Sequence, residues 1–173
     1  MSAINNLSDD NAILKMKEIA ERVNTCMLCT KLSSIPFHAR PMSISKVDET
    51  GKFWFMSSGE SDKIMEIQQN DQVQLIFSDP SGSRYMSVFG EADIFTDQKT
   101  IDEAWTPFAG AWFTDGKNTP GLSVIIVHPT YAHYWDTKDS KMITLLKIAA
   151  AAIAGKPFDD GVEGNLTVKI KYS

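Results

Sequence analysis

The sequence has no excess of positive charge. Its 173 residues include 17 lysines and arginines against 22 aspartates and glutamates, which gives a formal net charge of -5. The long-range field of such a chain repels a polyanion instead of attracting it. We therefore expect no nucleic-acid partner.

Long apolar runs are also missing. The N-terminal stretch "MSAINNLSDDNAIL" has neither the basic nor the apolar region of a secretory signal, and no segment approaches the ~20 apolar residues that cross a bilayer. The apolar stretch "ITLLKIAAAAIAG" is shorter and is interrupted by Lys147. We expect a soluble, cytoplasmic protein without a membrane partner.

Cysteine is scarce, with only Cys26 and Cys29 in "NTCMLCTKL". A structural zinc site needs four ligands, and a redox C-x-x-C motif usually opens a helix, where the dipole lowers the thiol pKa. The pair lies in strand-like sequence, in which positions i and i+3 point to opposite faces. The two thiols are therefore predicted to be small core residues, and no metal site is expected.

Catalytic motifs are absent as well. No nucleophile elbow and no serine, histidine and aspartate order stands out, and the three histidines lack metal-ligand spacing. No catalytic acid or base can be assigned from the sequence.

What the chain does contain is strand-like alternation punctuated by turns. Ser8, followed by two acids and an apolar face, predicts a helix over about 9–23, and a second helix is predicted over about 61–69. Gly90 is predicted to mark a bulge, and Pro107 to break a third helical segment, "DQKTIDEAWTPFAGAWF". The predicted strands are "TCMLCTKL", "HARPMSISKV", "KFWFMS", "QVQLIFSD", "RYMSVFGEADIF", "GLSVIIVHP" and "YAHYWDT".

The last two strands are predicted to meet at Pro129. Beyond them, "KMITLLKIAAAAIAG" predicts a helix that ends at Gly155, a mobile loop is expected over about 155–164, and "EGNLTVKI" has weak strand alternation. Six or seven strands joined mostly by turns predict a mainly β fold with α (α+β). We expect one domain over 1–173, an antiparallel barrel with short packing helices, and no doubly wound sheet, because no glycine-rich phosphate turn is present.

The stretch "FWFMSSGESDKIMEI" carries the clearest binding signal. Ser57, Ser58 and Ser61 supply hydroxyls next to a helix start, which is a common anion site. Lys63 stands in the first helical turn, where a cation opposes the macrodipole by about 0.3 to 1 kcal/mol unless an anion is bound. Arg40 is expected on a neighbouring strand, and its guanidinium suits phosphate. There are two alternatives to an anion site. The helix could be an ordinary capped helix with a solvated lysine, and Arg40 could form a surface ion pair.

Five ordered segments carry a family resemblance. The segments "ARPM", "FWFMSSGESDKIMEIQQNDQVQLIFSDP", "RYMSVFGEADI", "AWFTDG" and "AHYWD" resemble the general stress protein 26 group of the pyridoxamine 5'-phosphate oxidase-like, FMN-binding split-barrel superfamily, over about residues 10–170. The resemblance implies a split β-barrel and a homodimer with FMN held at the subunit interface.

The resemblance also implies a set of cofactor-binding residues. Arg40, Ser61 and Lys63 match residues that hold the FMN phosphate, and Trp135 matches a tryptophan that approaches the flavin from the partner subunit. The remaining matches line the ribityl chain or the ring system: Pro41, Met42, Ser43, Met56, Ser57, Ser58, Tyr85 and Trp112.

Two departures from the family pattern bear on function. Relatives commonly have Arg-Lys after the serine where this chain has Asp62 and Lys63, and the tail lacks the Arg-x-His segment of authentic pyridoxamine phosphate oxidases. The resemblance therefore implies an FMN-binding, stress-related flavin-dependent oxidoreductase of unknown substrate, with a nicotinamide or other small-molecule electron donor. A non-catalytic flavin-binding or sensing module is the alternative. A further alternative is a split barrel that binds a deazaflavin, or haem through His38, His128 or His133.

Overall fold

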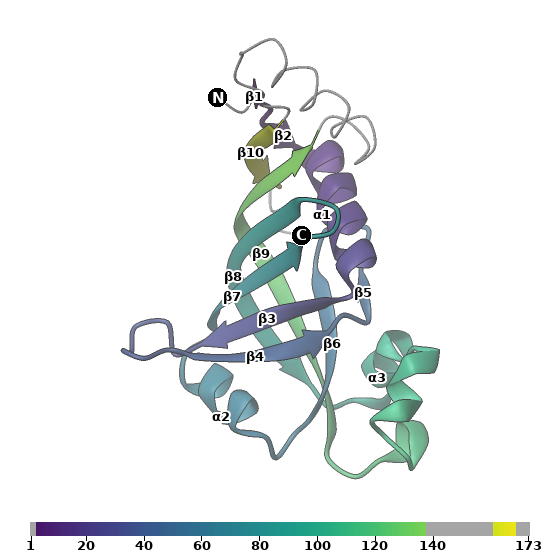
Figure 1. Cartoon of the computed structure of the whole chain (residues 1–173). Coiled ribbons are helices and arrows are strands. Elements are labelled where there is room, and N and C mark those ends of the chain that lie inside the picture. Colours follow the sequence, from purple (N-terminus) through teal and green to yellow (C-terminus); the bar gives the residue numbers. More distant parts are fainter. Residues whose placement is uncertain (1–2, 138–160, 169–173) are drawn as a thin grey trace.

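The computed structural model describes residues 3–137 and 161–168, and Figure 1 shows its elements along the chain. Its α-helices are α1 (Asp9–Val23), α2 (Asp62–Gln69) and α3 (Gln98–Ala104), and two 3-10 helices, η1 (Pro107–Ala111) and η2 (Gly116–Asn118), follow α3. The strands are β1 (Ala3–Ile4), β2 (Leu7–Ser8), β3 (Thr25–Thr30), β4 (His38–Ser43), β5 (Lys46–Val47), β6 (Phe53–Ser58), β7 (Gln72–Asp79), β8 (Arg84–Phe95), β9 (Leu122–Thr137) and β10 (Gly161–Thr167).

The strands form one strongly curved sheet that does not close. Its order is β1-β10-β9-β8-β7-β3-β4, while β6 pairs with β9 and β5 only. The first half of β9 pairs with β6 and the second half with β10, so β9 connects both parts of the sheet. No backbone ladder joins β4 to β6. The fold is therefore the predicted split barrel, mainly antiparallel, with β1 and β2 parallel to β10.

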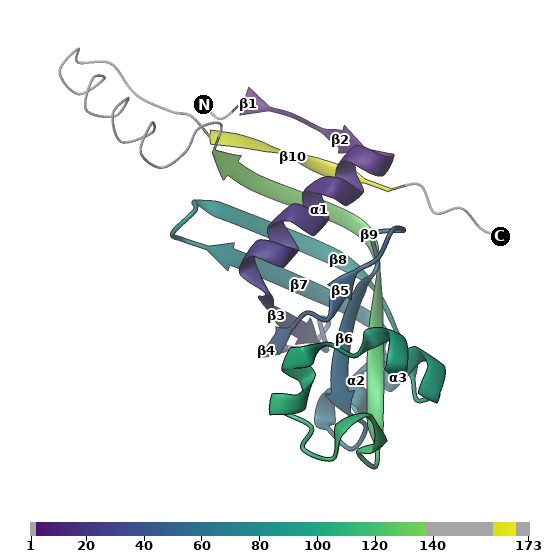
Figure 2. The ribbon, with the colours of Figure 1, turned by 90° about the vertical axis from the view of Figure 1, so that its right-hand side faces the viewer.

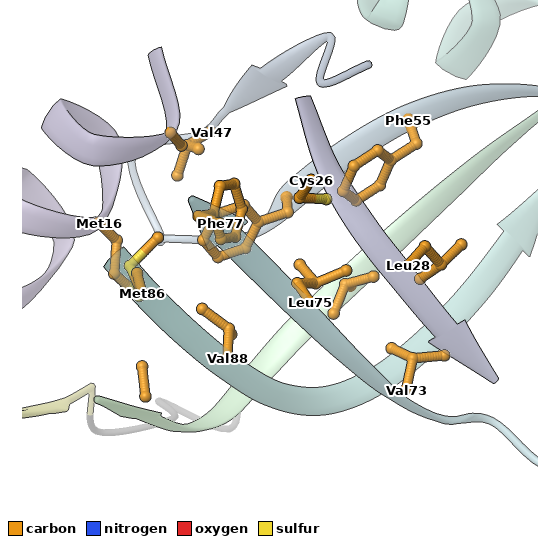
Figure 3. Close-up of a cluster of buried hydrophobic side chains, with 14 of the residues drawn as sticks. Met16, Cys26, Leu28, Val47, Phe55, Val73, Leu75, Phe77, Met86 and Val88 are labelled. Carbon is orange, nitrogen blue, oxygen red and sulfur yellow. The ribbon is translucent and has the colours of Figure 1, made fainter. Parts of the chain in front are cut away.

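The main core lies between the inner face of this sheet and α1, which crosses it diagonally (Figure 2). Figure 3 shows Phe77, Leu75 and Leu28 in a row along this core, with Met16 of α1 next to Met86 at one end. Each such side chain contributes about 1.5 to 3 kcal/mol by leaving water. A second, smaller cluster on the opposite side of β6 and β9 packs beneath α3 and includes Trp54, Ile101 and Ile126.

Both cysteines are free and buried, as predicted for small core residues. Burial, helped by the neighbouring Cys29, raises the pKa of Cys26 to about 12. Burial also raises the pKa of Cys29, although the charge of Arg40 acts against it. Neither thiol has the lowered pKa of a redox cysteine.

The prediction of two strands separated at Pro129 is wrong, because β9 runs without interruption from Leu122 to Thr137. The pairing register shifts between Phe89 and Gly90, and Pro129 lies opposite Gly90 at this bulge. Proline is tolerated within a sheet at a bulge, where a ladder hydrogen bond is missing in any case. The prediction that Gly90 marks a bulge is thus confirmed, and the same bulge keeps β9 continuous.

Other predicted elements agree with the structure to within a few residues. The segment "HARPMSISKV" divides into β4 and β5, and the weak tail signal corresponds to β10. The two-residue strands β1 and β2 were not predicted, because their pairing with β10 joins opposite ends of the chain. The predicted helix "KMITLLKIAAAAIAG" and most of the predicted loop over 155–164 lie outside the described residues. Within the described part, no helix has both the length and the apolar character needed to span a bilayer.

Candidate functional site

A cleft of about 830 Å³ lies where the barrel is split, between β4 and β6. This volume is within the usual range of small-molecule sites. One wall is formed by β4 and the start of the adjacent strand β3. A second wall is formed by the end of β6 and the start of α2, and the segment around η1 forms a third. The lining residues are Asn24, Thr25, Pro41, Met42, Ser43, Ile44, Ser45, Met56, Ser57, Ser58, Lys63, Thr106, Pro107, Phe108, Ala109, Ala111, Trp112 and Phe113.

The cleft brings together eight of the twelve residues that the family resemblance implied as cofactor contacts. These are Pro41, Met42, Ser43, Met56, Ser57, Ser58, Lys63 and Trp112. Arg40, Ser61, Tyr85 and Trp135 are not in its wall. The eight come from three segments far apart in the sequence, so the split of the barrel is what makes them neighbours.

Lys63 is the single charged side chain among the described residues that line the cleft. It stands in the first turn of α2, and no carboxylate of the described residues lies within ion-pair distance of its Nζ. Partial burial and the nearby charge of Arg40 lower the pKa of Lys63, against the opposing attraction of Asp62. Both causes disfavour the bare cation. A bound anion would stabilise it.

The serines next to Lys63 hold the loop before α2 in shape. The Ser61 hydroxyl donates to the Ser58 carbonyl oxygen at 2.8 Å, and the hydroxyls of Ser57 and Ser61 lie 3.3 Å apart. Ser61 is the N-cap residue of α2, yet its side chain accepts no hydrogen bond from the helix. The start of α2 therefore keeps N–H groups that a ligand can use.

Arg40 is engaged in a buried network that the sequence did not predict. Its Nη2 donates to Glu66 Oε2 of α2 at 2.9 Å, and its Nη1 donates to Thr30 Oγ1 at 2.6 Å. Thr30 Oγ1 also donates to Glu66, and His38 Nδ1 lies 2.6 Å from Glu66 Oε1. Burial acts to raise the pKa of Glu66, but the hydrogen bonds from Thr30, His38 and Arg40 outweigh it and lower this pKa to about 2.

This network changes the charge balance around the cleft. The Arg40 guanidinium is close enough to Lys63 to lower its pKa, but its own charge is matched by a buried carboxylate. Asp62, the departure from the family pattern, is exposed and outside the cleft wall. Lys63 is thus left as the one uncompensated cation among the described wall residues.

Tyr85 and Trp135 lie on a different surface, which we call the open face. The two residues are opposite each other on β8 and β9. The open face is the outer side of β3, β7, β8 and β9, and its exposed apolar residues are Met27, Ile76, Tyr85, Tyr131 and Trp135. Pro41 pairs with Met27, so the open face borders the cleft along β4.

The three histidines are outside the cleft wall. His38 contacts Glu66, His128 Nε2 lies 3.0 Å from Asp93 Oδ2, and His133 Nδ1 lies 2.8 Å from Asn165 Oδ1. In the described part of the chain, no three histidine, cysteine or acidic side chains are grouped as a metal site would require.

The main residues that sequence reasoning missed belong to the third wall and to α2. Thr106, Pro107, Phe108, Ala109, Ala111 and Phe113 surround η1, and "TPFAGAWF" was interpreted only as a broken helix. Its signal was an apolar run without the spacing of a buried helical face. Glu66 lies three residues after Lys63 on α2, but nothing in the sequence indicated that a strand arginine would reach it.

Comparison with known families gives a match over most of the chain. Residues 11–159 match the family described as pyridoxamine 5'-phosphate oxidase like. Among curated proteins, bli-3 of Neurospora crassa is 26% identical over 128 residues, covering 69% of this chain and 61% of bli-3. The chain therefore spans about three fifths of the length of that relative.

Solved structures are similar over a larger share of the chain. A crystal structure from Jannaschia sp. CCS1, described as a general stress protein 26, has a TM-score of 0.75 at 24% identity, and the match covers 89% of this chain and 96% of that one. The general stress FMN/FAD binding protein of Xanthomonas citri has a TM-score of 0.63 at 26% identity, with 75% and 90% covered. The first of these likenesses concerns the fold alone.

Proposed function

The chain belongs to the pyridoxamine 5'-phosphate oxidase-like family, and on this basis we propose that it binds FMN in the cleft at the split of the barrel. The observation that carries the proposal is Lys63, a partly buried cation without an ion-pair partner among the described residues, at the start of α2. A helix start with a free cation is suited to a phosphate ester. The similar Xanthomonas citri protein is described as FMN/FAD binding.

The residues of the cleft fit the phosphate and the ring system of FMN. Lys63, the hydroxyls of Ser57 and Ser58 and the first N–H groups of α2 would hold the phosphate. The segment Pro41, Met42 and Ser43 offers backbone polar groups and flat apolar surface along β4 for the ring system. Arg40, with two of its five N–H donors bonded to Glu66 and Thr30, would contribute its field and its remaining donors next to the phosphate.

We further propose that the protein is a flavin-dependent oxidoreductase with a small-molecule electron donor. Bound flavin supplies the redox chemistry, and the protein supplies binding and electrostatics. Besides Lys63, no ionisable side chain of the described residues lines the cleft. Hydride exchange at the flavin needs no protein acid or base, so this wall does not conflict with such an enzyme.

The same lack of an acid or base also favours a second candidate function, a non-catalytic flavin-binding or sensing module. NAD(P)H oxidation measured with FMN-loaded protein separates the two. Turnover well above that of free FMN excludes the non-catalytic function, and a rate equal to that of free FMN excludes catalysis with this donor.

A homodimer with the flavin at its interface is part of the proposal. The open face exposes five large apolar side chains on neighbouring strands, which is a common property of association surfaces. Because Pro41 lines the cleft and pairs with Met27 of the open face, a second subunit on this face would reach the edge of the cleft. Trp135 would then approach the flavin of the partner.

Titration of the purified protein with FMN tests the cofactor proposal. We expect the flavin spectrum to shift on binding, and Lys63→Ala to weaken binding by about 1.5 to 3 kcal/mol, because one charge-assisted hydrogen bond is lost. Lys17→Ala is the matched control, since Lys17 of α1 pairs with the exposed Glu49 and lies outside the cleft. No FMN binding at tens of micromolar, or equal affinity of the Lys63→Ala and Lys17→Ala variants, would contradict the assignment.

A further inference from the structure

The charge of the cleft is sufficient for one anionic group. Lys63 is the one charged side chain among the described residues of its wall, and the neighbouring Arg40 is paired with Glu66 at 2.9 Å. The Glu66 side chain is only 5% exposed and cannot turn away into water without leaving the network. A phosphate held by Lys63 therefore leaves no uncompensated cation in the described wall for a second anion.

The wall opposite the serine loop is apolar and aromatic. Around η1 it presents Phe108 and Trp112, whose side chains are 83% and 76% exposed, together with Pro107, Ala109 and Phe113. Two large aromatic side chains so exposed on one short segment leave flat apolar surface in contact with water. A ring stacked on them would remove that surface and gain the usual preference of aromatic pairs.

The open face would not supply the missing charge if a second subunit covered the cleft. Its exposed apolar members are interspersed with Gln74, Ser87 and His133, and none of the described positions that share this face in the strand registers is a lysine or arginine. The described strand positions of the open face would therefore bring more aromatic surface to the cleft, including Trp135, and no cation.

We propose that the second ligand of this cleft is an uncharged, planar aromatic molecule that stacks on Phe108, next to Trp112 at the edge of the flavin ring, and that the cleft discriminates against anionic aromatic compounds. This inference depends on the proposed function, because it assigns Lys63 to the flavin phosphate. It concerns binding selectivity and names a substrate class that the FMN assignment leaves open.

Binding of a matched pair of probes to the FMN-loaded protein tests the inference. 1,4-Naphthoquinone is uncharged, whereas 1,4-naphthoquinone-2-sulfonate has the same ring system and one negative charge, and equilibrium dialysis measures both. We expect the neutral probe to bind about tenfold more tightly or better. Phe108→Ala should lower the affinity for the neutral probe by about five- to tenfold. The affinity for FMN should stay unchanged, because Phe108 is outside the predicted flavin contacts.

A charge added to the wall provides the complementary test. Ala111 is exposed and lines the cleft, so Ala111→Lys introduces a second cation, and Ala111→Met adds similar length without charge. We expect Ala111→Lys, and not Ala111→Met, to bind the sulfonate as tightly as the neutral probe. Phe37→Ala, which removes an exposed aromatic side chain outside the cleft, should change neither affinity.

The possible failures can be told apart. Absence of FMN binding overturns both the proposed function and this inference. FMN binding with equal affinity for the two probes overturns the inference alone, as does unchanged binding of the neutral probe to Phe108→Ala. If Phe108→Ala weakens dimerisation while both probes bind as before, the aromatic wall is a subunit contact and the inference is wrong.

Discussion

Glu66 is the side chain that most affects the interpretation of this site. The serine and lysine loop predicted an anion site from the sequence, and Arg40 was expected to be its guanidinium. In the structure, Arg40 donates to Glu66 and Thr30 instead of lining the cleft. Whether Arg40 touches the phosphate stays a prediction, but the paired charge shows why Lys63 is the better residue for a mutational test.

Replacement of Glu66 by glutamine should destabilise the protein by about 2 to 3 kcal/mol at pH 7, because it leaves Arg40 without its buried counter-charge. The pKa of Glu66 in the folded protein is about 2, below its ordinary value of 4.5, so its ionisation stabilises the fold above pH ~4.5. This contribution should fall as the pH decreases towards 2. Urea unfolding at pH 7 and pH 3 measures it, with Glu18→Gln as the exposed control.

The wild type and the Glu66→Gln variant should therefore differ less at pH 3 than at pH 7. A difference that is the same at both pH values would mean that ionised Glu66 contributes nothing to stability. Arg40 and His38 are partly exposed, so water screens their interaction with Glu66. The expected loss of stability is therefore smaller than the full pKa shift of Glu66 would give.

At the scale of elements, the bulge between β8 and β9 lets one strand serve two parts of the barrel. A Cβ atom on Gly90 would lie 2.2 Å from the carbonyl oxygen of His128, so the strands approach too closely there for any side chain. Residues of β9 before the bulge pair with β6, and those after it pair with β10. The position of β6, and with it one wall of the cleft, therefore depends on this bulge.

Gly90→Ala should accordingly lower the melting temperature strongly, with a loss of about 3 kcal/mol or more, because backbone has to move to relieve the contact. Gly110→Ala in η1 is the matched control, since nothing lies within 4 Å of its added Cβ. Thermal unfolding followed by circular dichroism compares the two. Equal melting temperatures for both variants would show that the strands at the bulge move apart at little cost.

At the scale of the whole molecule, two large apolar surfaces are not covered by the described chain: the open face and the aromatic wall of the cleft. They border the same strand, β4, from two sides. A second copy that covers the open face would reach the rim of the cleft. Dimer formation and flavin binding are therefore expected to be coupled.

Ile76→Glu should convert the proposed dimer to a monomer of about 19.2 kDa, because it places a charge in the middle of the open face, and it should also weaken FMN binding. Leu14→Glu changes an even more exposed apolar residue on α1, away from this face, and this variant should stay dimeric. Light scattering at several concentrations measures the mass. A monomeric wild type, or a dimeric Ile76→Glu variant, would contradict the composite site.

The sequence alone determined the strands and helices with strong local periodicity, the bulge at Gly90, the burial of both cysteines and the loop that carries Lys63. These features depend on neighbours within a few residues, or on an ordered set of segments that resembles a known family. The tertiary structure alone decided that β9 is continuous, that Arg40 pairs with Glu66 and that η1 forms the third wall. Each of these depends on contacts between residues distant in the chain, which no local pattern specifies.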